Sequence, residues 1–217
     1  MKTVFSYYVN CQGHDPESEL KLIALWRQEW LRRGFNPVVL VEWHARRSSG
    51  FSEFNNAVSQ LPTVNSQDYE RACFLRWAAL ADAGGGWMMD YDVFPNQFTA
   101  LPVFTEEQMG KLQLMQANCV CPCLVHATPV VAMRLCNEFA TGKYGLRKMG
   151  EKDHYSDQYA LEDLVGAKAD WIEMNDFVLG YGDVGWEKAQ AVHFSNSSTA
   201  PRGKSPRWKH IPDLLPK

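Results

Sequence analysis

The sequence predicts an α/β fold in which helices flank a Rossmann-like, mostly parallel central sheet, and two observations support this. A strand-like run at residues 3–9, a helical run after Pro16 and an aliphatic run at residues 37–41 follow one another within the first 41 residues. This order is that of a βαβ unit, which requires a parallel sheet. The aliphatic run contains no polar residue, as expected of a strand that is covered on both faces.

Local patterns define the first elements. The strand at residues 3–9 ends in the polar turn at residues 10–13. The helix that follows has apolar side chains at helical spacing, and Gly34 stands where a glycine commonly ends a helix. The apolar positions of this helix are Leu20, Ile23, Ala24, Trp26, Trp30 and Leu31.

The middle and the end of the chain predict further elements of the same domain. A helix at residues 66–83 leads through three glycines into a short strand at residues 87–89. Strands are expected within residues 111–125 and helices at 128–140 and 156–165. The tail, residues 196–217, is rich in Ser, Pro, Lys and Arg and is expected to wrap the surface of one domain that spans residues 1–217.

The composition excludes several classes of protein. With 46% hydrophobic residues and eight Trp, the chain has enough apolar material for a core. Its net charge of -3 and scattered cations exclude the basic stripe of a nucleic-acid-binding protein. No apolar run has the length of a transmembrane or signal segment, so we expect a cytoplasmic protein without a transmembrane segment.

The six cysteines predict reduced thiols, because no secretion signal accompanies them. Cys119, Cys121 and Cys123 form the one cluster that suggests a metal. Zinc sites normally pair cysteines across two to four residues with a second such pair, which the sequence lacks. The three are therefore expected to be buried thiols in two short strands between residues 112 and 125.

Arg76 is the one charged residue between Ala72 and Ala81, in a helix that is apolar around nearly its whole circumference. The positions that would contact it on the same helix contain no carboxylate. A guanidinium keeps its charge and is rarely buried unpaired. Its partner is therefore a structural carboxylate of another element or a ligand, unless the side chain reaches the surface.

Asp90 and Asp92 follow the strand at residues 87–89. In an extended segment their side chains share one face, with Cα atoms about 6.5 Å apart. Two such carboxylates repel each other, and a hard divalent cation between them turns the repulsion into attraction. The alternative is a solvated turn after an edge strand, but the glycines and the helix with Arg76 favour a metal site.

Together these residues resemble a known family. Arg76-x-x-x-Leu80, the three glycines and Asp90-Tyr91-Asp92-Val93 resemble the signature of the DXD-motif glycosyltransferases of the GT-A fold, which include enzymes of polysaccharide biosynthesis. Residues 156–161 are similar to the Asp-Gln element near the reaction centre of such enzymes. Residues 191–196 resemble the His-Phe segment that supplies a late metal ligand and diphosphate contacts.

The resemblance implies a hexosyltransferase that takes a sugar from a nucleotide-diphosphate donor, by default a UDP-hexose, and passes it with retention to a glycan or another hydroxyl acceptor. The implied metal ligands are Asp90, Asp92 and His193; because imidazole suits Mn²⁺ better than Mg²⁺, His193 favours Mn²⁺. The implied catalytic residues are Asp157 and Gln158. The implied nucleotide-sugar contacts are Tyr8, Val9, Asn10, Arg76, Asp90, Tyr91, Ser195, Asn196 and Lys204.

Several alternatives stay open from the sequence. Ser156 and Asp157 are also what a helix N-cap and its first turn favour. His193 is equally compatible with a structural role after a strand. The chain as a whole is compatible with a catalytically silent nucleotide-sugar-binding module. A haloacid-dehalogenase-type phosphotransferase also uses Asp-x-Asp after a strand, but Phe94 stands where that class usually has Thr or Val.

Overall fold

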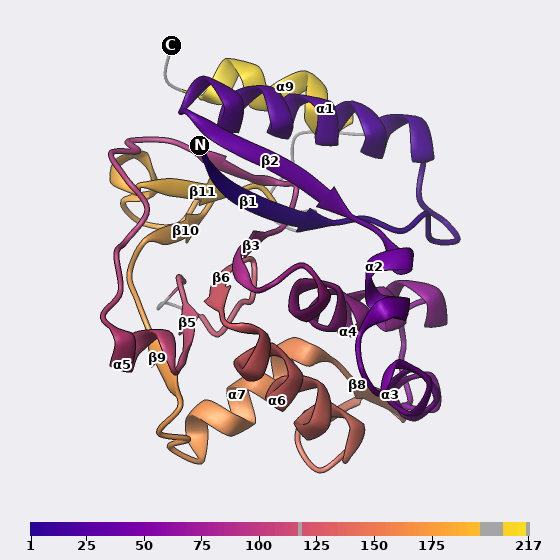
Figure 1. Cartoon of the computed structure of the whole chain (residues 1–217). Helices are drawn as coiled ribbons and strands as arrows, with labels where there is room; N and C mark the ends of the chain where they lie inside the picture. The colour runs from indigo at the N-terminus through magenta and orange to yellow at the C-terminus, as the bar shows by residue number, and fades with distance from the viewer. Residues whose placement is uncertain (117–118, 196–205, 216–217) are drawn as a thin grey trace.

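A six-stranded sheet forms the centre of the computed structural model, which describes residues 1–116, 119–195 and 206–215 (Figure 1). Strand β1 pairs in parallel with β2 and β3, and β5 pairs in parallel with β9. Only β6 runs antiparallel to its neighbours β3 and β5 among these strands, so the prediction of a mostly parallel sheet is confirmed. In sheet order the strands are β2 (Phe35–Leu40), β1 (Lys2–Tyr7), β3 (Gly86–Met89), β6 (Leu124–Ala127), β5 (Leu112–Leu114) and β9 (Ile172–Met174).

A second, three-stranded sheet holds β4 (Val93–Pro95), β11 (Ala191–His193) and β10 (Val178–Gly180). Strand β4 follows β3 after only three residues, so the chain passes from one sheet to the other at residues 90–92. Strand β11 is antiparallel to β4 and places His193 opposite Val93. A separate hairpin contains β7 (Leu146–Met149) and β8 (Lys152–Tyr155).

Helices cover both faces of the central sheet. Figure 1 shows α1 and α9 together on one side of β1 and β2, and α4 and α6 on the other side. The helical segments are α1 (Pro16–Arg32), α2 (Glu42–Arg47), α3 (Phe51–Val58), α4 (Gln67–Asp82), α5 (Glu106–Met109), α6 (Pro129–Ala140), α7 (Asp157–Gly166), η1 (Trp186–Lys188) and α9 (Arg207–Leu214).

Side chains cap the first turns of three helices, and the cap at Ser156 is the one that the sequence indicates. The side chain of Asp15 accepts a hydrogen bond from the backbone of α1, Thr128 does the same for α6, and Ser156 for α7. These bonds satisfy backbone N–H groups that have no partner within the helix. Helices α2 and α3 have weaker patterns and were not predicted.

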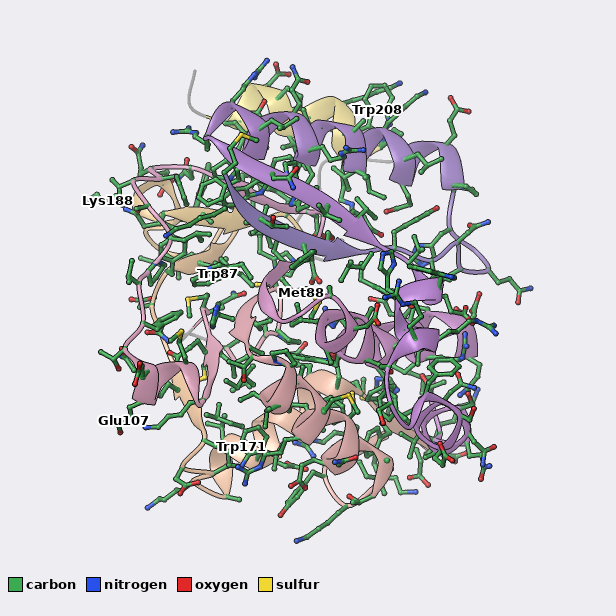
Figure 2. All side chains as sticks on the ribbon, viewed as in Figure 1. Trp87, Met88, Glu107, Trp171, Lys188 and Trp208 are labelled. Atoms are coloured by element: carbon green, nitrogen blue, oxygen red, sulfur yellow. The ribbon has the colours of Figure 1, made fainter. Side chains whose placement is uncertain are left out.

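Strand β3 is buried on both of its faces, which explains its uninterrupted apolar sequence. Met88 belongs to the apolar cluster beneath α4 and α6, whereas Trp87 and Met89 belong to the cluster on the side of α1. Figure 2 shows Trp87 and Met88 in the middle of the molecule, between the helical layers. The strand that leads to Asp90 is therefore held rigidly in the core.

The tail is more ordered than its composition indicates. Residues 207–214 form α9, which packs against α1 and buries Ile211 completely. The expectation that residues 196–205 wrap the surface lies outside the described residues. Across the described part of the chain, no helix combines the length and the apolar character that crossing a bilayer requires.

The turn between α4 and β3 depends on Gly85. All three glycines there have positive φ, and a Cβ added to Gly85 would lie 2.7 Å from the carbonyl oxygen of Ala127 and from Cδ of Pro129. A Cβ at Gly84 would meet no atom within 4 Å. The close approach of β6 and α6 to this turn therefore requires glycine at position 85.

We predict that Gly85→Ala lowers the free energy of unfolding by roughly 3 kcal/mol or more, since it adds overpacking to backbone strain. Gly84→Ala is the matched control and carries only the strain of roughly 1–2 kcal/mol. Chemical denaturation of both variants measures the difference. Equal losses would show that the contacts with Ala127 and Pro129 yield easily.

The first turn of α4 is fixed by Glu70, a carboxyl group that is only 4% exposed. It accepts hydrogen bonds from Nδ2 of Asn65 at 2.8 Å and from the Thr63 hydroxyl at 3.4 Å. Burial raises the pKa of Glu70 to about 7, although these two hydrogen bonds oppose the shift. The folded protein therefore holds this proton more tightly than the unfolded chain.

Because of this raised pKa, Glu70 makes the free energy of unfolding fall as the pH rises from about 4.5 to about 7, by up to roughly 3 kcal/mol. Glu70→Gln keeps the shape and removes the charge, so we predict a higher Tm than wild type at pH 8 and an almost equal Tm at pH 5. Glu107→Gln, at a side chain that is 85% exposed, is the control. A pH-independent effect of Glu70→Gln would contradict the assignment.

Candidate functional site

A pocket of about 410 Å³ lies at the carboxyl ends of β1 and β3, the edge at which α/β sheets bind ligands. Most of the predicted site residues line it: Tyr8, Val9, Arg76, Asp90, Tyr91, Asp92, Asp157, Gln158, His193 and Ser195. Asn10 is exposed and is not among the lining residues. Asn196 and Lys204 lie outside the described residues.

The Asp-Tyr-Asp motif forms a turn and not the extended segment that its position after a strand suggests. The N–H of Val93 donates to the carbonyl of Asp90 at 3.0 Å, which closes the turn as the chain leaves for the second sheet. The N–H of Asp90 donates to the carbonyl of Cys123 at 2.8 Å. Even so, one carboxylate oxygen of each aspartate and one nitrogen of His193 lie within 4.8 Å of one another.

Arg76 finds its partners in two carboxylates of other elements. Its Nη1 is 2.7 Å from Oδ1 of Asp90, and its Nη2 is 2.5 Å from Oδ2 of Asp157. Trp77 donates from Nε1 to the same oxygen of Asp157 at 3.1 Å. Burial disfavours the charge of Arg76, but the two carboxylates outweigh it and hold its pKa well above its usual range.

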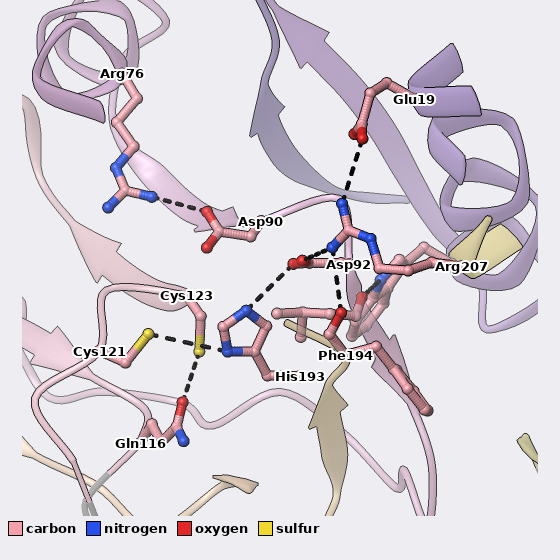
Figure 3. A network of polar contacts seen from close by, with 12 residues as sticks. Glu19, Arg76, Asp90, Asp92, Gln116, Cys121, Cys123, His193, Phe194 and Arg207 are labelled. Carbon is pink, nitrogen blue, oxygen red and sulfur yellow. Dashed lines mark hydrogen bonds and ion pairs between the residues drawn. The ribbon is translucent and has the colours of Figure 1, made fainter. Parts of the chain in front are cut away.

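Asp92 is the centre of a second network (Figure 3). Its Oδ2 pairs with Arg207, whose other terminal nitrogen is 3.4 Å from Glu19. Its Oδ1 is 3.3 Å from Nε2 of His193. The backbone fixes the same unit, since the N–H of Phe194 donates to the carbonyl of Asp92 at 2.8 Å.

The two aspartates of the motif titrate differently. Burial raises the pKa of Asp90 to about 6, against the opposing charge of Arg76. Burial acts on Asp92 in the same sense, but His193 and Arg207 outweigh it and lower the pKa of this carboxyl. The same interaction favours the charged form of His193. Asp92 raises the pKa of His193 well above the usual range, although the burial of the imidazole acts in the opposite direction.

The cysteine cluster lies beside this network, in the loop between β5 and β6. Cys123 is buried, as predicted, and its thiol donates to Oε1 of Gln116 at 3.0 Å. Cys121 lines the pocket, with Sγ 3.9 Å from Nδ1 of His193, and Cys119 is exposed. The prediction of buried thiols in two strands is therefore wrong for the exposed Cys119 and the half-buried Cys121, and none of the three cysteines lies in a strand, because β5 ends at Leu114 and β6 starts at Leu124.

Asp157 and Ser156 divide the two roles that the sequence left open. The hydroxyl of Ser156 caps α7 by accepting from the N–H of Tyr159 at 3.1 Å. Asp157 is buried at the pocket, and its Oδ2 accepts hydrogen bonds from Arg76 and Trp77. The side chain of Gln158 lines the pocket and donates to Glu162 at 3.3 Å.

Sequence reasoning missed three residues of this site: Glu19, Cys121 and Arg207. Glu19 is indistinguishable in sequence from any acid in the first turn of a helix. The sequence before Arg207 has no pattern typical of a helix or a strand. The position of Arg207 next to Asp92 is therefore visible only in the folded chain. The spacing rule for zinc sites removed Cys121 from consideration.

The donor set suits a hard or borderline divalent cation. Oδ1 of Asp92 is buried and accepts no hydrogen bond from the described residues, so it has a free lone pair. Neighbouring ligands of an octahedral ion at about 2.1 Å lie about 3 Å apart, close to the 3.3 Å between this oxygen and Nε2 of His193. Oxygen and imidazole ligands together fit Mn²⁺.

Comparisons with known proteins place the fold. A family model described as a domain of unknown function, DUF8765, matches residues 2–106, which include Arg76, Asp90 and Asp92. No curated protein matches the sequence. A solved structure, that of a glycosyltransferase involved in the glycosylation of the major capsid of PBCV-1, is similar with a TM-score of 0.55. The match covers 97% of this chain and 98% of that one at 11% identity, and it shows a shared fold.

We predict that Arg76→Ala lowers the free energy of unfolding by roughly 3–5 kcal/mol, because it leaves the buried Asp157 and the half-buried Asp90 without a countercharge. Arg46→Ala is the control, since this arginine pairs with Glu42 on the surface, where such a pair contributes at most about 1 kcal/mol. Denaturant titration of both variants tests this. Equal stabilities would mean that water reaches the Arg76 network.

Proposed function

We propose that this protein is a metal-dependent glycosyltransferase that moves a hexose from a nucleotide-diphosphate donor to a hydroxyl of a glycan or similar acceptor. The observation that carries the proposal is the meeting of Asp90, Asp92 and His193 in one pocket at the carboxyl edge of the sheet. The fold shared with a glycosyltransferase supports the same reaction class.

The nucleotide would bind at the end of β1. Tyr8 and Val9 line this part of the pocket, and Tyr8 packs edge-on against Tyr91 with ring centroids 6.0 Å apart. These side chains offer apolar surface for a base next to the carboxylates that would face the diphosphate. We take a UDP-hexose as the donor to test first.

Asp92 and His193, with Asp90, would hold a Mn²⁺ or Mg²⁺ ion. Such an ion neutralises the charge that develops on the departing nucleotide diphosphate. The division of labour between the carboxylates follows from their partners. Oδ1 of Asp92 makes no hydrogen bond with the described residues and contacts His193 as an ion pair at 3.3 Å, whereas Asp90 shares its Oδ1 with Arg76.

We assign Arg207 as a second cation of the site beside Arg76; the suggestion of Lys204 for this role stays a prediction, since that residue lies outside the described part of the chain. Arg207 lies at the pocket, bound to Asp92 and Glu19. When a cation binds Asp92, the guanidinium loses part of its attraction there and can turn to the diphosphate oxygens. Arginine suits this role because its planar donors match phosphate oxygens.

The surroundings of Asp157 favour a retaining reaction. An inverting enzyme needs a carboxylate that removes the proton of the acceptor hydroxyl. Asp157 already accepts hydrogen bonds from Arg76 and Trp77 at Oδ2, so this oxygen is not available to take the proton of an acceptor hydroxyl. We therefore assign Asp157 and Gln158 to the orientation of donor and acceptor.

A thermal-shift assay with and without Mn²⁺ tests the proposal, with UDP-glucose, UDP-galactose and GDP-mannose as ligands. A donor at about a hundred times its Kd should stabilise the protein by about 2.7 kcal/mol. We expect a shift that requires Mn²⁺ and disappears in Asp92→Asn. Asp170→Asn, an exposed carboxyl outside the pocket, should behave like wild type.

The outcomes separate the alternatives. A metal-dependent shift followed by transfer to an added acceptor supports the transferase. The same shift without transfer to any acceptor of a glycan panel indicates a nucleotide-sugar-binding module. The absence of a Mn²⁺-dependent shift with every donor contradicts the proposal.

A further inference from the structure

The imidazole of His193 has neighbours of two different chemical types. On one side, Nε2 faces Oδ1 of Asp92 at 3.3 Å. On the other, Nδ1 faces Sγ of Cys121 at 3.9 Å, and Sγ of Cys123 belongs to the same group, with all three atoms within 4.8 Å of one another. Figure 3 shows the ring between the carboxylate and the two thiols.

We propose that Cys121, Cys123 and Nδ1 of His193 form a second metal site, for a thiophilic divalent cation such as Zn²⁺, and that this site competes with the carboxylate site for His193. Thiolate and imidazole ligands select borderline-soft ions, whereas oxygen ligands select hard ones. The second site does not depend on the proposed function. The competition does, because it presupposes that His193 serves the carboxylate site.

The distances suit tetrahedral coordination. With Zn–S at about 2.3 Å and Zn–N at about 2.05 Å, a sulfur and a nitrogen on one tetrahedral ion lie about 3.6 Å apart. The observed 3.9 Å between Cys121 and His193 needs only a small closure. A water molecule would complete the shell, or the thiol of the nearby Cys119, whose carbonyl accepts a hydrogen bond from the N–H of Cys121 at 2.8 Å.

The backbone explains how cysteines with one residue between them share a site. Cys121 and Cys123 lie in the turn that leads directly into β6, and this turn brings the two sulfur atoms within 4.8 Å of each other and of a nitrogen of His193. Cys121 reaches the pocket, so a cation has access, while Cys123 is shielded in the core. Shielding of this kind is typical of closed structural zinc sites.

Gln116 supplies a partner beyond the ligands themselves. Its buried amide now accepts from the thiol of Cys123 at 3.0 Å. When a metal takes the place of the thiol proton, the same amide can rotate and donate its N–H to the thiolate. Hydrogen bonds of this kind orient metal ligands and strengthen binding.

The competition follows from the valence of imidazole. A neutral ring has one free nitrogen lone pair and one N–H. When Nδ1 binds zinc, Nε2 carries the proton and points it at Asp92, so the carboxylate site loses its nitrogen ligand. Zinc bound to the thiols should therefore weaken Mn²⁺ binding about tenfold or more.

Titration with Co²⁺ under reducing conditions tests the second site by a spectrum that needs no nucleotide sugar. We expect intense thiolate-to-cobalt charge-transfer absorption and tetrahedral visible bands that saturate at one ion per chain and vanish when Zn²⁺ is added. Cys121→Ser and Cys123→Ser should lose the charge-transfer band. Cys136→Ser, a buried thiol of α6, should keep it.

Peptide mass mapping of the wild-type protein gives a second test that needs no variant. Zn²⁺ should protect Cys121 and Cys123 from alkylation in the partly denatured protein and leave Cys136 unprotected. A wild-type spectrum with only weak octahedral Co²⁺ bands, or a charge-transfer band that survives in Cys121→Ser and Cys123→Ser, would overturn the site. Equal protection of all three cysteines would overturn it as well.

The competition has a separate readout in the concentration of free Mn²⁺, followed by electron paramagnetic resonance. Zn²⁺ should release bound Mn²⁺ from wild type and much less from Cys121→Ser. Equal release from both proteins would show that zinc displaces Mn²⁺ at the carboxylates and would overturn the competition. Absence of Mn²⁺ binding in the first place would contradict the proposed function and leave the cobalt test of the thiol site intact.

Discussion

The charge balance at the carboxyl edge of the sheet is the constraint on which the rest of this structure depends. Asp90, Asp92, Asp157 and Glu19 meet there around two guanidinium groups, Arg76 and Arg207. Four ionised carboxylates and two guanidinium groups leave two negative charges, and buried charge without compensation is costly. The charge of Asp92 raises the pKa of His193, so a protonated imidazole would supply part of the balance. A divalent cation would supply the two missing positive charges and leave the imidazole neutral. The uncompensated negative charge of the site therefore favours the binding of a cation.

Topology brings these groups together from distant parts of the chain. The parallel strand β3 ends at Met89 and delivers Asp90, while the antiparallel strand β6 starts at the same edge and delivers Cys123 beside it. Strand β11, paired with β4, returns His193 to the motif more than a hundred residues after Asp90. One antiparallel strand in a parallel sheet thus puts thiols next to carboxylates, which a purely parallel sheet would keep at opposite edges.

The sequence predicts the parts of this arrangement that local physics controls. The helix cap at Ser156, the apolar strand β3 and the need of Arg76 for a partner outside its own helix all follow from short-range patterns, and the structure confirms them. The turn at residues 90–92 does not follow, because it is imposed by the pairing of β4 with β11. Arg207 reaches Asp92 because α9 packs on α1, and these helices lie about 180 residues apart in the chain. A contact at this separation cannot be recognised from the local sequence of either helix.

The different environments of Asp90 and Asp92 would allow one motif to serve two purposes. Asp90 accepts a hydrogen bond from Arg76 at Oδ1. The same guanidinium also donates to Asp157 and so links the two carboxylates. The raised pKa of Asp90 shows that this partner does not fully offset its burial. Asp92 has a lowered pKa, and its Oδ1 makes only the 3.3 Å ion pair with His193 among the described residues, as suits a carboxylate that stays ionised and can accept a cation. An ion would therefore bind Asp92 and His193 first and draw Asp90 in afterwards, against the pull of Arg76. Metal binding would in this way loosen Arg76 from Asp90 while Asp157 still holds it, which frees a cationic donor at the position where the donor sugar would lie.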